Sequence, residues 1–549
     1  MRDHTQAVRI LIDHMQERLQ SQPSNFDRVS ELAARHPFYA ALLIVVLLLA
    51  GGSLLLFSVR PLLFHDVACW AKEAGEIQFG MYKIPFPLHW FVLGWLRNSS
   101  RVLDSWVNHH RQTARERFLD KQTVRDRAIH ISMPVILAGE ACAEFKPALL
   151  RASAFGRLPV TLLIWGEGGS GKTSIACQIA RWCLSDNEED WPCRHAMLPV
   201  LIERELDAPV AANHDPLFEA IRRQLEDVLG LDYPPDDELL EALLRRRRLL
   251  VIVDHLSEMS QTTQERVRLD VPSFKPKALV ITSRRRELLG GITLIELEPM
   301  RVAAERLSEF MSAYLRARGM REQFSDPEFF AACERLTTLV GDRAVTVLCV
   351  RLYADQLIEA KKAAEGRGLP GNLPELMLRY VSLMNEAVED DQRPNAEVQR
   401  DAQKVAWACL DHSFRPSETD RSSVIEALGE DAEARLEYLQ QRLFLVEVTG
   451  VREDRVRFKL DPLAEYLAAM NLIEQLEAQP TKWRRFFKDL GSDVEAAREF
   501  LLALRDCLRT SSGVPSFVLS GLTNLLEAGP EEKPSRTAVA GTKSQPARH

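Results

Sequence analysis

The spacing of apolar residues changes character along this chain, and the first clear pattern lies between residues 158 and 300. Short apolar runs recur there, separated by stretches with helix-like or turn-like sequence. These runs occupy residues 160–165, 197–202, 249–253, 278–281 and 292–297. Because strands that alternate with helices form parallel sheets, the pattern predicts an α/β domain with a mostly parallel sheet covered on both faces.

Beyond Pro299 the apolar residues follow helical spacing almost throughout. The predicted helices span residues 302–315, 328–339, 344–363, 376–388, 396–410 and 462–476. A hairpin-like stretch, 443–460, interrupts them with a turn at Thr449 and Gly450. Helices that flank a small hairpin suggest a winged-helix module. Helical sequence continues to about residue 527, and the tail beyond Gly529 has few large apolar residues, so we expect it to be disordered.

The longest apolar run is near the N-terminus, at residues 38–59, which are 22 positions without a charge. A helix of that length covers about 33 Å, close to the thickness of a bilayer core, so we expect a transmembrane helix. A signal peptide is one alternative, although its apolar part is shorter and nearer the terminus. A buried core helix is the other alternative.

The orientation of this span involves a conflict. Five arginines precede it and few basic residues follow, so the positive-inside rule favours a cytoplasmic N-terminus. The α/β domain after the span, however, carries a motif, described below, that also needs the cytosol. A second membrane insertion between residues 79 and 96 would reconcile the two, but Pro85 and Pro87 favour an interfacial or re-entrant hairpin there. We expect an anchor in the inner membrane with the domain after it in the cytosol.

Length and composition narrow the class of protein further. At 549 residues the chain is long enough for three or four domains. The formal charge of −8 argues against a nucleic-acid partner, which calls for a basic domain or stripe. The 9 cysteines include no C-x-x-C pair, so neither a disulfide framework nor a zinc site is indicated.

The most specific motif follows the first strand of the α/β region and matches G-x-x-x-x-G-K-[ST] in full. Its residues are Gly166, Glu167, Gly168, Gly169, Ser170, Gly171, Lys172 and Thr173. Glycines let such a loop turn its backbone N–H groups toward phosphate oxygens, and the following helix adds partial positive charge. We therefore predict that the loop binds ATP or ADP, with Lys172 at the β- and γ-phosphates and the Thr173 hydroxyl on Mg²⁺.

Three further residues are candidates for chemistry at the phosphates. Asp254 ends the apolar run 249–253 and is the predicted second Mg²⁺ ligand. Glu258, four positions later, is the candidate base that polarises the attacking water; the alternative is a solvated acid at a helix start. Arg284 follows the run 278–281, where its guanidinium could detect the γ-phosphate.

Taken together, GEGGSGKT, the stretch VIVDHLSE, the strand end ITSRR and the later FKLDPLAEYLAA resemble the NACHT branch of the STAND signalling ATPases over about 129–476. With the patterns above, the expected parts are 1–37, a flanking amphipathic helix; 38–59, the span; 60–128, a juxtamembrane segment and connecting helix; and 129–300, the NTPase domain. After these come 301–410, a helical domain; 411–476, a winged-helix-like module; 477–528, C-terminal helices; and 529–549, the tail.

The resemblance implies a switch: a closed monomer with ADP opens, exchanges it for ATP and oligomerises through the nucleotide domain. It assigns Lys172, Thr173, Asp254, Glu258 and Arg284 to the roles given above. Two motifs, the acidic cluster after the third apolar run and the start of the winged-helix motif, depart from the family pattern. His255 takes the place of a small residue and Ser257 that of a carboxylate, while Leu460 stands where a phosphate-touching histidine is common.

The function we expect is a membrane-anchored signalling ATPase with slow hydrolysis that assembles into homo-oligomers, in bacterial defence. Assembly would cluster the membrane segments, which then either perturb the bilayer or serve only as anchors. One alternative is a continuously cycling ATPase that remodels or moves a membrane substrate. Another is a nucleotide-stabilised scaffold that does not hydrolyse, which the Ser257 departure favours.

Overall fold

The computed structural model describes most of the chain between residues 37 and 527. The described residues are 37–73, 76–79, 82–85, 88–155, 160–166, 168–206, 215–230, 235–267, 276–284, 286, 294–300, 302, 304–340, 346–362, 368–410, 414–449, 454–490, 494, 497–511 and 513–527. The expected amphipathic helix before residue 37, the tail after 528 and Glu167 lie outside them. The chain forms two compact units, Met1–Gln112 with Asp236–Arg248, and Thr113–Pro235 with Leu249–His549.

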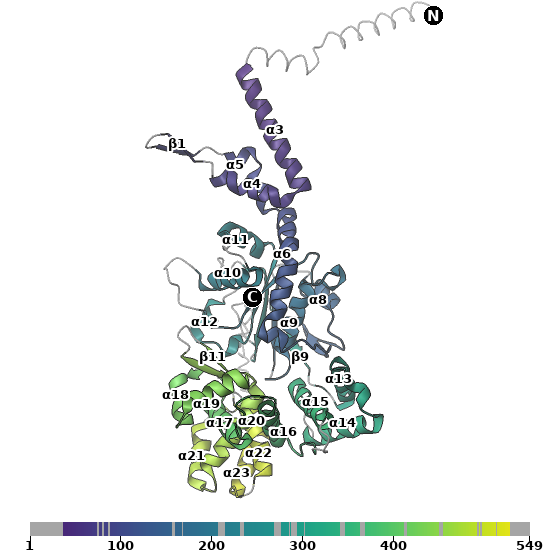
Figure 1. Cartoon of the computed structure of the whole chain (residues 1–549), viewed down its shortest axis with the longest axis vertical. Helices are drawn as coiled ribbons and strands as arrows, with labels where there is room; N and C mark the ends of the chain where they lie inside the picture. Colours follow the sequence, from purple (N-terminus) through teal and green to yellow (C-terminus); the bar gives the residue numbers. More distant parts are fainter. Residues whose placement is uncertain are drawn as a thin grey trace, which may run out of the picture. The chain divides into compact units, whose positions relative to one another are not determined.

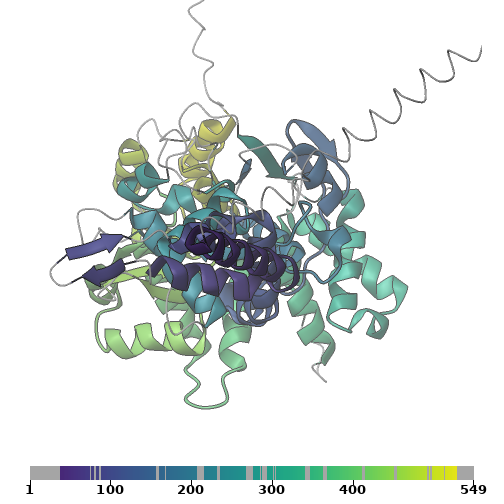
Figure 2. The same ribbon diagram turned by 90° about the horizontal axis from the view of Figure 1, so that it is seen from above.

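The first unit is built around the apolar N-terminal helix. It contains α3 (Pro37–Val59), α4 (Pro61–Glu73), the hairpin strands β1 (Glu76–Phe79) and β2 (Tyr82–Pro85), α5 (Leu88–Phe91), the short helix η1 (Gly94–Asn98), the start of α6 (Ser100–Asp120) and α11 (Asp237–Arg245). Figures 1 and 2 show the hairpin projecting beyond α4. Residues 79–96 were expected to form an interfacial or re-entrant hairpin. They contain the last residue of β1, all of β2 and α5, and the first part of η1.

One helix in the described part of the chain has the length and composition of a membrane span. It is the stretch Ala40–Val59 of α3, and only 6% of its most apolar window is buried. Its leucines and valines are therefore exposed to the surroundings, as in Leu48, which is 70% exposed. This agrees with the sequence pattern, since apolar residues occupy every side of the helix rather than one stripe.

The second unit contains a seven-stranded sheet in the order β4-β3-β9-β5-β8-β7-β6. The strands are β3 (Val135–Leu137), β4 (Glu140–Cys142), β5 (Val160–Trp165), β6 (Leu198–Ile202), β7 (Leu249–Val253), β8 (Ala278–Ser283) and β9 (Ile295–Pro299). The five strands from β9 to β6 are parallel, whereas β3 and β4 are antiparallel additions at one edge. The predicted mostly parallel α/β sheet is confirmed.

The central strands have continuous apolar sequence because they are buried along their whole length. Every residue of β6, β7 and β8 is buried, including Thr282 and Ser283 at the end of β8. The helix α9 (Lys172–Cys183) packs against β5, β6, β7 and β8, and α10 (Pro216–Leu229) packs against β6. Short helices, α7 (Gln122–Arg125), α8 (Pro147–Ser153), η2 (Glu188–Asp190), η3 (Leu256–Glu258) and α12 (Gln261–Arg266), complete this part.

The rest of the second unit is mainly helical. Its first helices are α13 (Ala304–Ala317), η4 (Arg321–Gln323), α14 (Asp326–Val340), α15 (Val347–Lys362), α16 (Leu373–Glu386) and α17 (Asn395–Ala408). After α18 (Arg421–Leu428), α19 (Ala432–Glu437) and the π-helix η5 (Tyr438–Arg442) come α20 (Asp461–Leu476), α21 (Pro480–Leu490), α22 (Arg498–Thr510) and α23 (Ser516–Glu527).

A small antiparallel sheet interrupts these helices, in the order β10-β12-β11. Strands β11 (Val446–Thr449) and β12 (Arg455–Phe458) form the hairpin expected at 443–460, and β10 (Thr419–Asp420) pairs with β12. The sequence pattern did not separate β10, α18 and α19, because each is too short to show a full apolar period.

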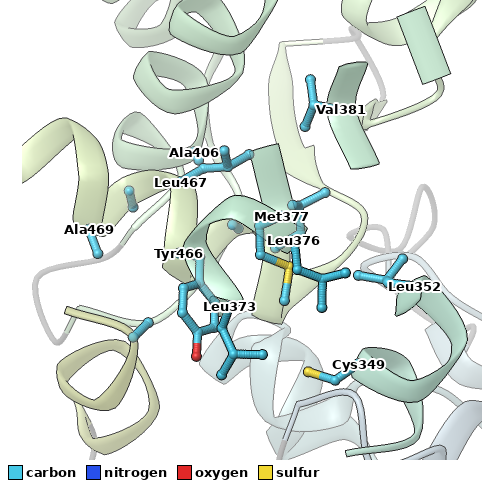
Figure 3. Close-up of a cluster of buried hydrophobic side chains, with 14 of the residues drawn as sticks. Cys349, Leu352, Leu373, Leu376, Met377, Val381, Ala406, Tyr466, Leu467 and Ala469 are labelled. Atoms are coloured by element: carbon cyan, nitrogen blue, oxygen red, sulfur yellow. The ribbon is translucent and has the colours of Figure 1, made fainter. Parts of the chain in front are cut away.

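A hydrophobic core joins the helices of the second unit that follow the seven-stranded sheet. Side chains from α15, α16, α17 and α20 converge in it, among them Leu352, Leu376, Ala406 and Leu467 (Figure 3). The helix α20 is buried on nearly all sides, which fixes its first residues in place. The position of that helix start becomes important at the functional site.

Candidate functional site

The glycine-rich loop lies between β5 and α9, as the motif requires. Gly169 and Gly171 have φ angles of 72° and 96°, in the left-handed region that favours glycine. These conformations turn the chain sharply from the strand end into α9, which begins at Lys172. The loop and the helix start therefore form a concave backbone surface of the kind that binds phosphates.

The polar side chains of the loop fit an anion. The buried Lys172 Nζ donates to the carbonyl oxygen of Gly166 at 2.8 Å. Burial and the nearby Arg284 lower the pKa of Lys172 to about 8, against the opposing effect of three carboxylates. The buried Ser170 hydroxyl has no hydrogen-bond partner among the described residues. A phosphate would supply acceptors for both groups, because each is a donor buried away from water.

Thr173 and Asp254 meet where β7 ends. The Thr173 hydroxyl donates to Asp254 Oδ1 at 3.0 Å, and Thr282 from β8 donates to the same oxygen. Asp254 is fully buried. Burial alone would raise the pKa of Asp254, but His255 and the hydrogen bond from Thr282 hold it well below the ordinary value. A hydroxyl beside an ionised carboxylate is a suitable donor set for Mg²⁺, so these two residues could hold that ion.

His255, which the sequence patterns marked only as a departure, lies between two carboxylates. Its backbone is left-handed, with φ 58°, and its N–H donates to Thr282 Oγ1 at 2.8 Å. The imidazole Nε2 is 3.1 Å from Asp254 Oδ2, and Nδ1 is 3.4 Å from Glu258 Oε1. Burial opposes protonation, but the two carboxylates raise the pKa of His255 to about 9. The ring is therefore cationic at neutral pH.

Glu258 is held by arginines from two distant segments. Arg284 Nε lies 2.9 Å from Glu258 Oε1, and Arg457 of β12 pairs with Glu258 Oε2. The Glu258 side chain is only 6% exposed. Although burial alone would raise it, the pKa of Glu258 is well below its usual range because Arg457, Arg284 and His255 surround it. A carboxylate in this state is ionised, but its oxygens are already engaged by the protein.

Arg284 also reaches the start of α20. Its Nη2 lies 2.6 Å from Asp461 Oδ2, and its Nη1 lies 3.7 Å from Glu465 Oε1. Burial opposes the charge of Arg284, but these carboxylates and Glu258 raise its pKa further, so it remains a cation. A single guanidinium thus joins the sheet end to the C-terminal helices through three carboxylates.

The glycine-rich loop itself is covered by two helices of the C-terminal part. The N–H of Leu348 in α15 donates to the Gly169 carbonyl at 3.3 Å. A Cβ atom at Gly169 would come within 2.9 Å of Pro462 Cγ and 3.1 Å of Leu348 Cβ. Glycine is therefore needed at this position for close packing as well as for its φ angle.

A cavity of about 1890 Å³ opens beside the loop, lined by Gly169–Ile175, His130, Arg351 and Arg457, among others. Small-molecule sites commonly measure about 300–1,000 Å³, so a nucleotide has room here. The structure brings the predicted site residues together around one end of the parallel strands: Lys172, Thr173, Asp254, Glu258 and Arg284. Glu167 is outside the described residues.

Sequence reasoning missed the residues that engage Glu258 and Arg284. These are His255, Arg457, Asp461 and Glu465. Arg457 is separated from Glu258 by 199 positions. The one signal in the sequence is the motif FKLDPLAEYLAA, which contains Asp461 and Glu465 but does not reveal what they contact.

The fold and the loop define a class. The mostly parallel sheet has a glycine-rich loop after its central strand, a buried lysine where the following helix starts and a buried aspartate directly after β7. This combination is a phosphate-loop NTPase fold.

Comparisons with known proteins add little to this. No protein-family model matches the chain, and no curated protein matches it. Among solved structures, Cdc6p from Pyrobaculum aerophilum is 17% identical, with 58% of this chain and 88% of that chain covered and a TM-score of 0.26. A STAND protein with a tetratricopeptide repeat sensor from Pyrococcus horikoshii is 14% identical, with 70% and 53% covered and the same TM-score of 0.26.

Proposed function

We propose that this chain is a membrane-anchored, nucleotide-switched signalling ATPase of the NACHT type within the STAND class. It would bind ATP or ADP with Mg²⁺ and assemble into homo-oligomers in the ATP state. The NTPase domain would lie in the cytosol, with α3 in the bacterial inner membrane, in a role in defence. No nucleic-acid partner enters this proposal.

The nucleotide would be held by the glycine-rich loop. The backbone from Gly166 to Thr173 and the Lys172 ammonium would bind the phosphates, while Thr173 and Asp254 would hold Mg²⁺, which neutralises phosphate charge. The Ser170 hydroxyl, which has no partner within the described part of the chain, and the buried Lys172 support this assignment.

The observation that carries the switch is the attachment of Arg284 to α20. Arg284 ends β8 beside the loop, and its guanidinium is bound to Asp461 and Glu465. A γ-phosphate and these carboxylates would compete for the N–H groups of Arg284, because a guanidinium binds phosphate and carboxylate oxygens alike. ATP would thus weaken the attachment of α20, whereas ADP would leave it intact. A ligand shifts an equilibrium only through such differential contacts.

The arrangement around Arg457 supports a winged-helix module as the moving part. The element order α17, β10, α18, α19, β11, β12 and the sheet order β10-β12-β11 support this proposal, because a winged helix would have the same order. Arg457 is on β12, which would form part of the wing, and Asp461 begins the next helix. We infer that this module closes over the nucleotide in the ADP state without the phosphate-touching histidine that is common in the family.

The ion pairs of Glu258 favour a second candidate, a nucleotide-stabilised scaffold that does not hydrolyse. Glu258 is engaged by Arg284 and Arg457, so it could act as a base only after these contacts break. Hydrolysis in the open, assembled state distinguishes the switch from the scaffold.

The experiment is a measurement of mass for the full chain in detergent, by light scattering, with no nucleotide, with ADP and with ATP and Mg²⁺. We expect a monomer with ADP and an oligomer with ATP. The Lys172→Ala variant should remain a monomer in all three conditions, and Glu258→Gln should keep the ATP oligomer for longer. An identical mass with ADP and ATP for the wild-type chain would remove the switch.

The ATPase rate of the same samples separates the candidates. Slow turnover that Glu258→Gln abolishes supports the switch, whereas a rate no higher than the background without protein, for the wild type and Glu258→Gln alike, supports the scaffold. A steady rate well above roughly one per second would instead indicate a continuously cycling ATPase, since timers hydrolyse slowly.

A further inference from the structure

Large apolar side chains are exposed in the first unit beyond the apolar helix α3. Trp70 of α4 is 61% exposed, Trp90 of α5 is 63% exposed and Trp95 of η1 is 59% exposed. Leu63, also on α4, is 44% exposed. The three elements pack against one another, and the rings of Trp90 and Trp95 lie 6.2 Å apart. We call the exposed set Leu63, Trp70, Trp90 and Trp95 the tryptophan face.

The tryptophan face is directly connected to α3. Only Arg60 separates α3 from α4, and the ring of Phe57 in α3 packs edge-on against Phe64 in α4, with centroids 5.5 Å apart. Phe64, Ala68 and Val102 form a small buried core with Leu56 and Phe57 around it. Figure 1 shows α4 leaving the lower end of α3 at an angle instead of continuing it. The face is therefore fixed at the end of α3, at one level along that helix.

Basic groups lie at the same end of α3. Arg60 is exposed between the two helices. Arg101 of α6 is exposed too, donates to the Ser58 carbonyl at 2.5 Å and lies 6.0 Å from the centre of the Phe57 ring. Cations at the end of an apolar span, close to indole rings, match the headgroup region of a bilayer that contains anionic lipid.

We propose that the tryptophan face inserts into the headgroup layer of the same membrane that α3 spans. The helix α4 would then lie along the membrane surface, with Arg60 and Arg101 against anionic lipid phosphates. This rests on the span proposed above. It makes the region after α3 a second membrane contact of the first unit.

The composition of the face favours lipid over a second copy of the chain. Tryptophan combines a large apolar surface with an N–H donor, so it suits a layer that is apolar on one side and wet on the other. Asp66 lies between Leu63 and Trp70 on the exposed side of α4, with its side chain 75% exposed. In the headgroup layer that carboxylate, 3.7 Å from His65 Nδ1, stays hydrated, whereas the centre of a protein interface would take its charge out of water.

Tryptophan quenching in vesicles tests the proposal. The full chain would be reconstituted in phosphatidylcholine and phosphatidylglycerol vesicles, either plain or carrying bromine atoms close to the headgroup. We expect bromine to quench the wild-type fluorescence. The variant Trp70→Phe/Trp90→Phe/Trp95→Phe should lose most of that quenching, and Trp407→Phe, a matched change in the C-terminal helices, should lose none. Single substitutions of the three residues give the same answer if the triple variant does not fold.

Equal fluorescence in plain and brominated vesicles, or equal quenching of the triple variant and the wild type, would overturn the proposal. Burial of the three indoles by self-association without lipid would overturn it as well, in favour of a second copy. Alkaline extraction of the same vesicles reports separately on α3. A chain that is extracted lacks the span, whereas a chain that resists extraction but shows no quenching has the span without the tryptophan face in the lipid.

The basic groups have their own readout. Quenching in vesicles with phosphatidylglycerol should exceed that in pure phosphatidylcholine, and Arg60→Gln/Arg101→Gln should remove this difference. Equal quenching in both lipids would limit the contact to its apolar part and reject the phosphate contacts proposed for the two arginines.

Discussion

The two sides of the candidate nucleotide site differ in how much the protein already satisfies its own polar groups. On the loop side, the Ser170 hydroxyl has no partner among the described residues, and the backbone is turned for an anion. On the opposite side, Glu258 and Arg284 are paired with each other and with groups from β12 and α20. Phosphate binding therefore fits the arrangement as it stands, whereas chemistry at the γ-phosphate requires contacts to break.

This difference suggests why such a site suits a switch better than a fast enzyme. Breaking a buried ion pair by removing one partner costs about 3–5 kcal/mol, because the other charge is left without compensation. A ligand that replaces the lost partner avoids most of that cost. The closed arrangement can thus be stable without a γ-phosphate and become less stable with one, while a fast enzyme would gain nothing from engaging its own base.

The largest expected effect is on the loop side. Lys172→Ala should weaken binding of both ADP and ATP by roughly a thousandfold, about 4 kcal/mol, because a buried cation that faces the phosphates is lost. Calorimetric titration of the full chain measures this. Lys146→Ala, which removes an exposed lysine paired with Glu144, is the control and should bind as the wild type does. Tight binding by Lys172→Ala would show that the loop does not hold the phosphates.

The next effect concerns stability on the opposite side. Arg457→Gln should lower the free energy of unfolding by about 3 kcal/mol, because Glu258 loses a buried partner. Arg455→Gln, on the same strand, is the matched control. Its side chain is 47% exposed and pairs with Asp420, so it should cost less than about 1 kcal/mol. Thermal unfolding of the three proteins measures the difference. Equal shifts for the two variants would mean that the buried network adds nothing to closure.

A smaller effect should appear in the preference between nucleotides. Asp461→Asn/Glu465→Gln removes two charges that bind Arg284 but keeps the shapes of the side chains. With the two Nη groups of Arg284 released from α20, while Nε stays with Glu258, ATP should gain about tenfold over ADP, or 1.4 kcal/mol. Glu474→Gln, an exposed change on the same helix, should leave the ratio unaltered. An unchanged ratio of ATP to ADP affinities in the double variant would separate Arg284 from nucleotide sensing.

Local sequence patterns were sufficient for the sheet and the loop. The buried strands β6, β7 and β8 appear as continuous apolar runs because both faces are covered, and the loop has a fixed spacing of glycines and lysine. The carboxyl ends of parallel strands lie at one edge, so Asp254 and Arg284 could be expected to lie near the loop. The positions of these two residues near the loop can therefore be predicted from short segments of the sequence alone.

The contacts of Glu258 could not be predicted in the same way. Arg457 comes from a strand 199 positions away, and an ion pair between distant segments has no period or spacing to detect. Arg457 alternates with apolar neighbours on β12, so its sequence pattern is that of an ordinary exposed strand residue, yet it is buried. The role of His255 was missed for a related reason, since only the folded chain places its ring between two carboxylates.

The smallest expected effect is a pH dependence set by His130, which lines the cavity beside the loop. Burial and the nearby Arg181 lower the pKa of His130 from 6.5 to about 4. As pH falls below 6.5 the unfolded chain takes up a proton that the folded chain does not, so stability is complete above pH 6.5 and declines toward pH 4. Between pH 6.5 and 5.5 this decline should be about 1 kcal/mol. His130→Gln should flatten it, because glutamine does not titrate, and thermal unfolding of both proteins across that range measures the change. If the two proteins lose stability in parallel, folding does not oppose protonation of His130, and the surroundings of its ring must admit water.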